Sequence, residues 1–313
     1  MQRFTVCGEA LIDLVPERDV DSFHSSWAAL SAGGPMNTAI ALARLGNDVQ
    51  FCGRLSRDRF GRQLQRHLAG NGVRLERAVV VDDPTSLAVV SLDERAQASY
   101  TFHFAGTANF TWRPEELAQT SAEDWLHLAS LALVVPPGAA VLADWAAAHG
   151  GPMSIDLNVR PAVIPDPQAY WSAASRWIEI VGARGGVLKA SDEDVAFLAR
   201  GSGDRGEAID VLGRWAADAG CSLAVVTLGA QGAAASAPDG TRHSVPGRRV
   251  EVVDTVGAGD TFMAGFLSAY ATGADVDDAL RRGVDAAAFV CTRRGAQPPS
   301  RDELRSFAAG SRS

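Results

Sequence analysis

Residues 254–266, DTVGAGDTFMAGF, place two glycines and a carboxylate at the start of an apolar helical pattern. The first turn of a helix leaves backbone N–H groups unpaired, and together with the helix dipole these groups form an anion site. Because Gly257 and Gly259 carry no side chain, a phosphate can approach this backbone closely. The same dipole keeps Asp260 ionised and ready to accept the proton of a hydroxyl group. The stretch therefore indicates phosphoryl transfer, with a simple capped helix as the alternative.

Two other glycine-rich motifs do not fit this stretch. A dinucleotide fingerprint counted from Gly257 and Gly259 needs a third glycine where Phe262 stands. A Walker A loop needs a Gly-Lys pair, and the single lysine of the chain, Lys189, does not follow a glycine. The preceding residues 249–255, RVEVVDT, are rich in β-branched residues, so we predict a strand that ends where the glycines begin.

The composition bounds the class of protein. The chain has 313 residues, 47% hydrophobic and 21% charged, which suits a globular protein of one large domain or two smaller ones. A formal net charge of -8 argues against nucleic acid or an anionic membrane as a partner, since both need a basic surface. Four widely spaced cysteines without zinc-ligand spacing predict reduced, buried thiols. No signal peptide is recognisable, so a cytoplasmic protein that acts on a small substrate is expected.

Short apolar runs alternate with helical patterns along the chain. Runs such as RFTVCG (3–8) and SLAVVTLG (222–229) are separated by patterns such as MNTAIALARLG (36–46). This rhythm predicts an α/β fold with a mainly parallel central sheet and helices on both faces. Ligands of such folds collect at the carboxyl ends of the strands.

Two segments interrupt the rhythm. Residues 85–106 contain two β runs around a polar turn, whereas residues 14–30 are irregular and too short for a strand-helix-strand unit. We predict that these insertions, about 14–32 and 84–108, form a small β-sheet lid over the strand ends. An ordinary edge hairpin is the alternative.

Two motifs point to a known family. Residues 254–262 match D-T-x-G-A-G-D-x-F, and residues 31–46, SAGGPMNTAIALARLG, carry Gly-Gly followed by an asparagine that opens a helix. With these motifs the chain resembles the ribokinase family of sugar kinases, also called the phosphofructokinase-B (PfkB) type. The resemblance runs from GEALIDLVP (8–16) to TRRGAQPP (292–299) and implies one ribokinase-like kinase domain over residues 1–313. It also implies ATP and Mg2+, with K+ or another monovalent cation as an option.

The resemblance implies roles for the residues that match the catalytic and sugar-binding motifs. Asp260 is the expected base for the acceptor hydroxyl, and the amides of Gly257, Ala258 and Gly259 stabilise charge on the transferring phosphoryl group. The positions expected to bind the sugar are Asp13, Gly33, Gly34, Asn37 and Arg160. Carboxylate and amide groups suit sugar hydroxyls. Without the family, a turn aspartate at Asp13, a helix cap at Asn37 and a surface arginine at Arg160 remain alternatives.

One further sugar contact is predicted from the lid itself. Phe102 and Phe104 lie on one face of a predicted strand and suit the apolar face of a sugar. Packing in the core of the lid is the alternative.

The resemblance also implies a nucleotide site. The residues it assigns to ATP are Asn158, Lys189, Ser191, Asp194, Thr227, Gly229 and Gly232. Many members carry N-x-x-E where this chain has Ser191 and Asp194, so the carboxylate is shorter here. A solvated lysine at 189 and a hairpin turn around Gly229 and Gly232 are the alternatives.

The C-terminal segment resembles a monovalent cation loop. Its implied ligands, mostly backbone carbonyls, come from Asp254, Val256, Val290, Arg293 and Gly295. Members of the family often dimerise through the lid, so a homodimer is expected.

The acceptor is predicted to be an uncharged sugar. A sugar phosphate would need several cations beside Arg160, and the lid offers only Arg95 and His103. GEALIDLVP, DLNVRP (156–161) and KASDED (189–194) resemble fructokinase-like members. The prediction is ATP-dependent phosphorylation of D-fructose to fructose 6-phosphate. Alternatives are a kinase for ribose, 2-keto-3-deoxygluconate or a nucleoside, and a non-catalytic sugar-binding regulatory protein on a kinase fold.

Overall fold

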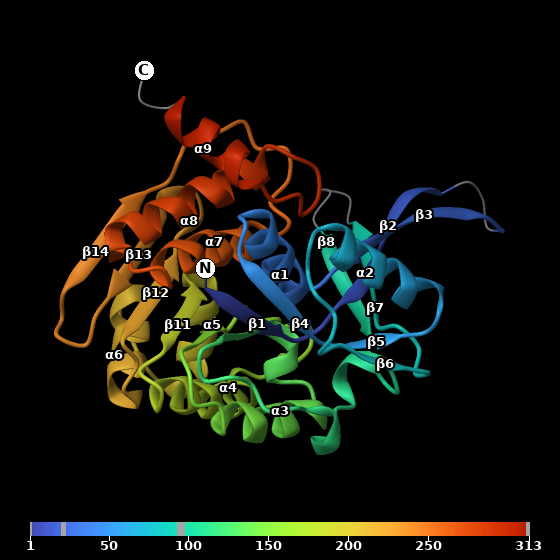
Figure 1. Cartoon of the computed structure of the whole chain (residues 1–313), viewed down its shortest axis with the longest axis horizontal. Coiled ribbons are helices and arrows are strands. Elements are labelled where there is room, and N and C mark those ends of the chain that lie inside the picture. The colour runs from blue at the N-terminus through green and yellow to red at the C-terminus, as the bar shows by residue number, and fades with distance from the viewer. Residues whose placement is uncertain (1, 20–22, 93–97, 311–313) are drawn as a thin grey trace.

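An eight-stranded sheet runs through the centre of the computed structural model (Figure 1). The structure describes residues 2–19, 23–92 and 98–310. From one edge to the other the strands are β14 (Arg242–Pro246), β13 (Gly232–Ser236), β12 (Leu223–Thr227), β11 (Val187–Ser191), β10 (Met153–Asp156), β9 (Trp125–Ala129), β1 (Arg3–Cys7) and β4 (Asp48–Cys52). Every pairing from β12 to β4 is parallel, and β13 runs antiparallel to both of its neighbours. The predicted mainly parallel sheet is confirmed.

Helices cover both faces of this sheet. Buried side chains on one face come from α1 (Gly34–Arg44), α7 (Ala258–Tyr270), α8 (Val276–Cys291) and α9 (Arg301–Ala309). Those on the other face come from α3 (Gly138–Ala147), α4 (Pro167–Gly182), α5 (Asp192–Ser202) and α6 (Ala208–Ala219). Central strands are apolar almost throughout, as in LAVVT of β12, because a strand covered on both faces has no solvent side. The α/β prediction is therefore confirmed.

Smaller elements complete the chain at the edges of the sheet. The α2 helix (Arg59–Gly70) packs on a two-stranded sheet of β5 (Arg54–Ser56) and β6 (Val79–Val81). The short 3-10 turns are η1 (Ala108–Phe110), η2 (Pro114–Glu116), η3 (Ser130–Leu133) and η4 (Gly229–Gln231).

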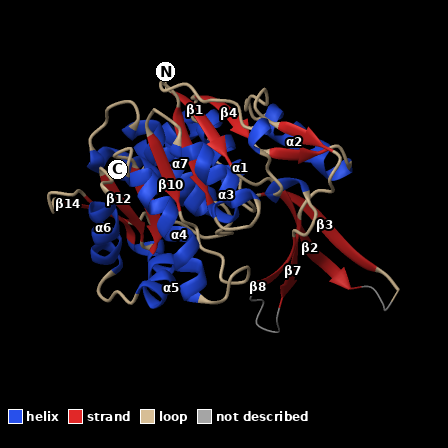
Figure 2. Cartoon of the chain, turned by 90° about the horizontal axis from the view of Figure 1, so that it is seen from below, coloured by secondary structure: helices blue, strands red, loops and turns tan. Residues whose placement is uncertain are grey.

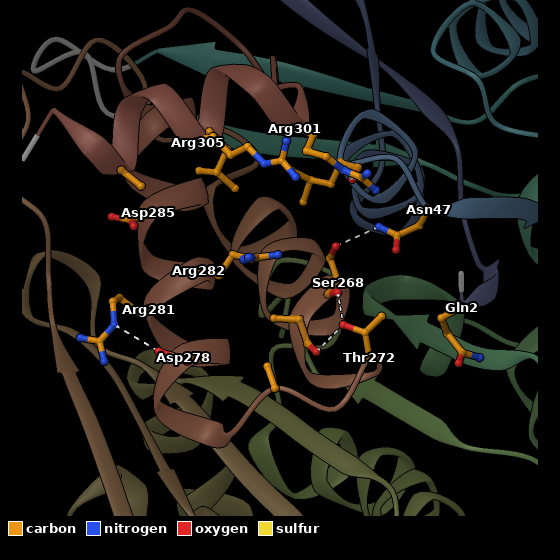
Figure 3. A pocket seen from close by; sticks show the side chains of 15 residues that line it. Gln2, Asn47, Ser268, Thr272, Asp278, Arg281, Arg282, Asp285, Arg301 and Arg305 are labelled. Carbon is orange, nitrogen blue, oxygen red and sulfur yellow. Dashed lines mark hydrogen bonds and ion pairs between the residues drawn. The ribbon is translucent and has the colours of Figure 1, made fainter.

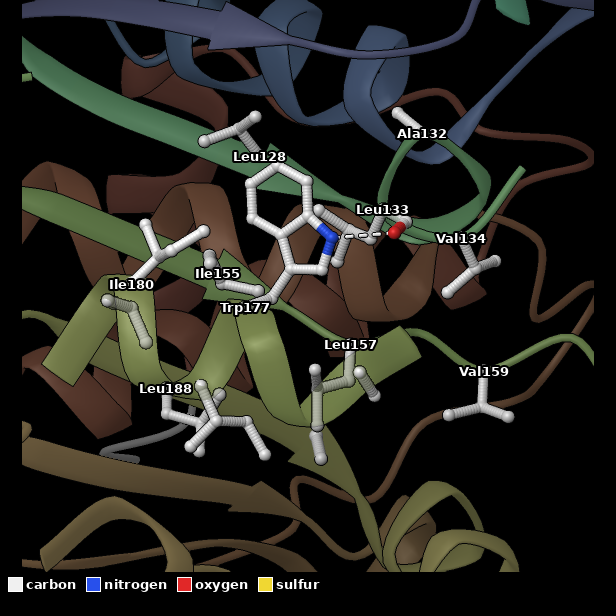
Figure 4. Close-up of a cluster of buried hydrophobic side chains, with 14 of the residues drawn as sticks. Leu128, Ala132, Leu133, Val134, Ile155, Leu157, Val159, Trp177, Ile180 and Leu188 are labelled. Atoms are coloured by element: carbon white, nitrogen blue, oxygen red, sulfur yellow. Dashed lines mark hydrogen bonds between the residues drawn. The ribbon is translucent and has the colours of Figure 1, made fainter. Parts of the chain in front are cut away.

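Trp177 of α4 anchors one of the two cores (Figure 4). Its side chain is fully buried and lies near Leu128 of β9 and Ile155 of β10. A buried indole needs a partner for its N–H, and Trp177 donates to the carbonyl of Leu133 at 2.6 Å. This bond ties α4 to η3, the turn that follows β9 at the carboxyl edge of the sheet.

A second sheet of four strands stands out from the body of the molecule (Figure 2). Its order is β3 (Ser25–Ala32), β2 (Leu11–Asp19), β7 (Leu87–Leu92) and β8 (Ala98–His103). The antiparallel β7–β8 pair matches the prediction for residues 85–106. The prediction that residues 14–30 are irregular is wrong for the described residues, because 14–19 belong to β2 and 25–30 to β3, where SSWAALSA largely alternates between more and less exposed positions. This small sheet starts at Leu11 and so includes Asp13, and Arg95 lies outside the described residues.

The strand predicted at residues 249–255 is also wrong. These residues precede α7 without forming a strand, and the side chains of Val252 and Val253 are 60% and 59% exposed. β-Branched composition favours a strand only where a neighbouring strand and a buried face are available. Here the backbone N–H of Val253 donates instead to the carbonyl of Cys291, at 2.8 Å, at the end of α8.

Two further expectations concern cysteine and membranes. All four cysteines are free thiols as predicted; Cys7, Cys52 and Cys221 are buried, and Cys291 is partly exposed. Among the helices that the structure describes, none combines the length and the apolar character needed to cross a bilayer.

Candidate active site

Asp260 lies in the first turn of α7, as the sequence predicts. Its carboxylate is buried, and the Nδ2 group of Asn37 in α1 donates to Oδ2 at 2.9 Å. Burial raises the pKa of Asp260, while the Asn37 hydrogen bond and the positive charges of Arg160 and Lys189 act in the opposite direction. A buried carboxylate with a raised pKa suits a base that must take up a proton during a reaction.

Three amides at the start of α7 are available to an anion. The backbone N–H groups of Gly257, Gly259 and Asp260 make no hydrogen bond to another described residue. The amide of Ala258, predicted to belong with them, instead donates to the carbonyl of Thr255 at 3.2 Å. Gly257 precedes the helix with a φ of 76°, the left-handed region that favours glycine. Of the three predicted amides, those of Gly257 and Gly259 are therefore unpaired and that of Ala258 is not, while the amide of Asp260 is an additional unpaired donor.

Gly34, the first residue of α1, lies next to the carboxylate of Asp260. A Cβ atom built at Gly34 would lie 3.0 Å from Nδ2 of Asn158 and 3.2 Å from Oδ1 of Asp260. The Cβ of Ser130 would be 3.5 Å away. The absent side chain thus leaves a space bordered by an amide, a carboxylate and the η3 turn.

The loop after β10 presents Asn158 and Arg160 to the same space. Asn158 has a φ of 39°, and its Oδ1 accepts a hydrogen bond from Nη1 of Arg160 at 2.7 Å. The backbone N–H of Arg160 donates to the hydroxyl of Tyr170 at 3.1 Å. These contacts fix the loop, and the charge of Arg160 acts on both Asp13 and Asp260. The surface-arginine alternative does not apply, because Arg160 is only partly exposed and tied to its own loop.

The small sheet contributes Asp13 and Phe102. Asp13 is half-buried in β2, and burial raises its pKa to about 6 while Arg160 acts to lower it. Its carboxylate makes no hydrogen bond to another described residue and so remains available to hydroxyl groups. Phe102 stacks beside Tyr100 and Phe104, with ring centroids 6.0 and 4.9 Å away, which is the packing given above as the alternative to a sugar contact.

The ammonium group of Lys189 lies next to the first turn of α7. A Cβ built at Gly259 would lie 3.4 Å from Nζ of Lys189, and Nζ donates to Oδ2 of Asp156 at 2.8 Å. Burial opposes the charge of Lys189, but the carboxylates of Asp156, Asp194 and Asp260 outweigh it and raise the pKa. With its side chain 3% exposed, Lys189 is not the solvated lysine of the alternative.

Ser191 and Asp194 form a capping box at the start of α5. Oγ of Ser191 accepts from the amide of Asp194 at 3.0 Å, and Oδ2 of Asp194 accepts from the amide of Ser191 at 2.8 Å. The other oxygen of Asp194 accepts from the amide of Val159 at 2.8 Å. Asp194 therefore joins α5 to the loop that carries Asn158 and Arg160.

The predicted nucleotide glycines lie in the β12–β13 hairpin. Thr227 ends β12, and Gly229 begins η4 with a φ of 53° and open space where a side chain would be. Gly232 has a φ of 107°, and a Cβ there would lie 2.1 Å from the carbonyl oxygen of Val245. Gly232 is thus required by backbone packing, whereas Gly229 leaves room for a ligand.

The predicted cation loop brings Asp254 and Gly295 together. The Asp254 carboxylate accepts from the amides of Val256 at 3.1 Å and Gly295 at 2.8 Å. The amide of Arg293 donates to the carbonyl of Val290 at 3.0 Å. Across the described ranges, no group of three or more His, Cys, Asp or Glu side chains is arranged to hold a metal ion. The ligands predicted for the monovalent cation are mostly backbone carbonyl oxygens, which are not counted among these side chains.

Sequence reasoning missed Glu9 and Asp156. Glu9 is 1% exposed, accepts from the amide of Ala132 at 3.1 Å, and has a pKa raised by burial to about 7. Through Ala132 it holds the η3 turn, where Ser130 has a φ of 64°. Gly33 packs on it, since a Cβ there would lie 2.6 Å from the carbonyl oxygen of Glu9. A carboxylate inside an apolar run was the available signal.

Comparison with known proteins places this arrangement in an enzyme class: the chain is an ATP-dependent carbohydrate kinase. Residues 1–303 match the model of the pfkB family carbohydrate kinases, and the chain belongs to that family. The alternative of a non-catalytic regulatory protein is thereby set aside.

Three relatives illustrate the degree of similarity. A fructokinase from Klebsiella pneumoniae is 33% identical over 317 residues, which cover 96% of this chain and 97% of the relative. A fructokinase double mutant from Vibrio cholerae O395, solved with fructose, ADP and potassium ion bound, is 29% identical with a TM-score of 0.82, covering 99% of this chain and 98% of that chain. Aminoimidazole riboside kinase from Salmonella enterica, complexed with aminoimidazole riboside and an ATP analog, is 26% identical with a TM-score of 0.82, covering 98% and 99%.

Proposed function

We propose that the chain is a fructokinase, which transfers the γ-phosphoryl group of ATP to the primary hydroxyl of D-fructose and forms fructose 6-phosphate. The observation that carries this proposal is the buried Asp260, held by Asn37 beside three unpaired amides at the start of α7. Fructokinases at about 30% identity over nearly the whole chain support the choice of sugar.

The proposed reaction uses Asp260 as the base. Asn37 occupies Oδ2, so Oδ1, which faces Gly34, takes the proton of the sugar hydroxyl. The hydroxyl oxygen bonds to the γ-phosphorus as the bond to the bridging oxygen breaks, and ADP leaves with the electron pair of that bond. The amides of Gly257 and Gly259 stabilise the charge on the transferring group.

The raised pKa of Asp260 has a consequence for the pH profile. The base works only when it is ionised, and burial places its pKa above that of an ordinary aspartate. The rate is therefore expected to fall as the pH is lowered through this raised pKa, at a higher pH than for an exposed carboxylate.

Asp13 and Arg160 favour an uncharged acceptor. The two side chains bring one negative and one positive charge to the same space, and Arg160 acts on the pKa of Asp13. A phosphorylated sugar placed against Arg160 would also meet the carboxylate of Asp13. Hydroxyl groups, in contrast, can donate to Asp13 and accept from Arg160.

Lys189 and the loop at Asn158 are proposed to hold the nucleotide phosphates, with Thr227, Gly229 and Gly232 beside them. Mg2+ would neutralise charge on the phosphates and would keep several of its waters beside a carboxylate. Both oxygens of Asp194 already accept backbone amides, so we assign Asp194 a contact with Mg2+ through water. For a monovalent cation such as K+, we propose the loop at Asp254, Val256, Val290, Arg293 and Gly295.

We further propose that residues 1–313 act as one kinase domain in the cytoplasm. In this proposal the small sheet closes over the site as a lid, and two copies of the chain form a homodimer through it. The sheet exposes Trp27, Leu30 and Tyr100 by 40%, 46% and 39%. Exposed apolar side chains on one sheet suit a second copy of the chain. Sedimentation should give a dimer for the wild type and a monomer for Leu30→Glu, and a wild-type monomer would refute the interface.

A riboside is the second candidate acceptor, because the aminoimidazole riboside kinase is as similar in structure as the fructokinase. A coupled assay of ADP release separates the two, with fructose, ribose, 2-keto-3-deoxygluconate and aminoimidazole riboside as acceptors. Fructose should give the highest kcat/KM. No turnover of fructose, with turnover of a riboside, would replace the proposal by the alternative.

A further inference from the structure

A cavity lies at the C-terminal end of α7, beside Ser268 and Thr272 (Figure 3). Its volume is about 560 Å³, within the range of roughly 300–1,000 Å³ that small-molecule sites occupy. Ser268 and Thr272 line it from the end of α7, whereas Asp260 lies in the first turn of that helix. The remaining walls come from α8, α9, the residues that follow α1, Ala274 before α8 and Gln2 before β1. The cavity is thus separate from the candidate active site.

The two carboxylates of this cavity are already paired. Asp278 lies 3.8 Å from Arg281, and Asp285 lies 3.0 Å from Arg248, which is not part of the lining. The lining contains four arginines and these two aspartates, so it keeps a net positive charge when both carboxylates are counted.

Three arginines of the lining remain to be considered. Arg282 is exposed, and its guanidinium group makes no hydrogen bond or ion pair with any residue that the structure describes. Arg301 donates to two neutral carbonyl oxygens at the end of α1, at 2.9 and 3.0 Å, so its charge is not cancelled there. Arg305 lies 3.6 Å from Asp302, whose side chain is 92% exposed and contributes little screening inside the cavity. The cavity is therefore positively charged, although the chain as a whole carries -8.

Asn47 and Ser268 contribute neutral polar groups to the lining of the cavity. Figure 3 shows Arg282 pointing toward the side on which Ser268 and Asn47 lie, with Arg301 and Arg305 at another side of the cavity. Nδ2 of Asn47 donates to Oγ of Ser268 at 3.0 Å, and Oδ1 of Asn47 makes no hydrogen bond within the described part of the chain. Oδ1 is thus an acceptor available to a hydroxyl group.

We propose that this cavity binds a phosphorylated sugar. Guanidinium groups are the preferred partners of phosphate, and Arg282 supplies one without an ion pair in the described chain, whereas the partner of Arg305, Asp302, is 92% exposed. Asn47 accepts from the sugar hydroxyls. None of the lining residues is aromatic, so the described cavity offers no ring on which a nucleotide base would stack.

The test is a calorimetric titration of the full chain with fructose 6-phosphate and, separately, glucose 6-phosphate. The double variant R282A/R305A removes the two charges and lies outside the catalytic machinery. Arg66 of α2 provides the matched control, because it too is an exposed helical arginine with no ion pair in the described chain. Thermal midpoints and kcat should be unchanged in both variants, which shows that the fold is intact.

We expect at least one hexose phosphate to bind the wild type and R66A alike, with at least tenfold weaker binding or loss of one class of site in R282A/R305A. Equal binding to all three proteins would overturn the proposal, as would tighter Arg282-dependent binding of AMP than of either sugar phosphate. The titration measures binding and does not depend on turnover. A failure to phosphorylate fructose would therefore refute the proposed reaction without affecting the test of sugar-phosphate binding to this cavity.

Discussion

The buried pair of Lys189 and Asp156 allows a quantitative prediction. The two charged atoms are 2.8 Å apart, and the side chains are 3% and 2% exposed. At this distance the attraction is about 6 kcal/mol for an effective dielectric constant of about 20, and removing one partner of a buried pair costs about 3–5 kcal/mol. Lys189→Met should cost the upper part of that range, because Asp156, Asp194 and Asp260 all lose the same cation.

Asp156→Asn should cost less, because Lys189 keeps the charges of Asp194 and Asp260 nearby. The double variant should be less destabilised than the sum of the single variants, by about 2–3 kcal/mol, since only the single variants leave a buried charge without its partner. Lys189→Met should also lower kcat/KM for ATP, because Nζ lies beside Gly259, whose amide is proposed to bind the phosphoryl group.

The assay is urea unfolding of the ligand-free protein at pH 8, followed by tryptophan fluorescence. Arg57 and Asp82 form a matched surface pair at 3.1 Å, with side chains 59% and 89% exposed. Breaking that pair should change the free energy of unfolding by no more than about 1 kcal/mol. If Lys189→Met were as mild as the surface variant, or if the two buried substitutions were additive, the charge balance inferred here would be incorrect.

Two further predictions concern the walls of the site. Gly34→Ala should lower kcat/KM for the sugar at least tenfold, or about 1.4 kcal/mol, because its Cβ meets Asn158 and Asp260 at 3.0 and 3.2 Å; Gly70→Ala, with nothing within 4 Å, should not. An unchanged KM and kcat in Gly34→Ala would place the sugar elsewhere. Glu9→Gln should gain stability relative to the wild type as pH rises from about 4.5 to 7, by up to about 3 kcal/mol, because the raised pKa of Glu9 makes its ionised form costly in the fold. Urea unfolding at pH 5 and pH 8 measures this, and a pH-independent difference would contradict it.

The helix start at Gly257–Asp260 could be predicted from sequence because its signal is local. The glycines and Asp260 lie within one helical turn, and a helix start is legible from nearby residues. Asn37, predicted to open a helix, is the fourth residue of α1, which begins at Gly34. Its bond to Asp260 joins residues 223 positions apart and was not predicted. The helix start was therefore predicted from nearby residues, whereas the hydrogen bond from Asn37 to Asp260 was not.

Glu9 and Asp156 were missed for the same reason. Glu9 meets Ala132 across 123 residues, and Asp156 meets Lys189 across 33, so both pairings depend on strand order. At residues 249–255 a strand was predicted that does not exist, because β-branched composition does not show whether a neighbouring strand is available. The fold class was easier, since it follows from many alternating segments rather than from one contact.

The central claim is that Asp260 takes the proton of the acceptor hydroxyl. Asp260→Asn keeps the size of the side chain, and its amide oxygen can still accept from Asn37, so sugar binding and folding should survive. The direct measurement is kcat of this variant with the best acceptor, alongside calorimetric binding of the same sugar. We predict a fall in kcat of about 10²–10⁴-fold with sugar affinity within a few-fold of the wild type. Turnover within tenfold of the wild type would contradict the assignment of Asp260 as the base.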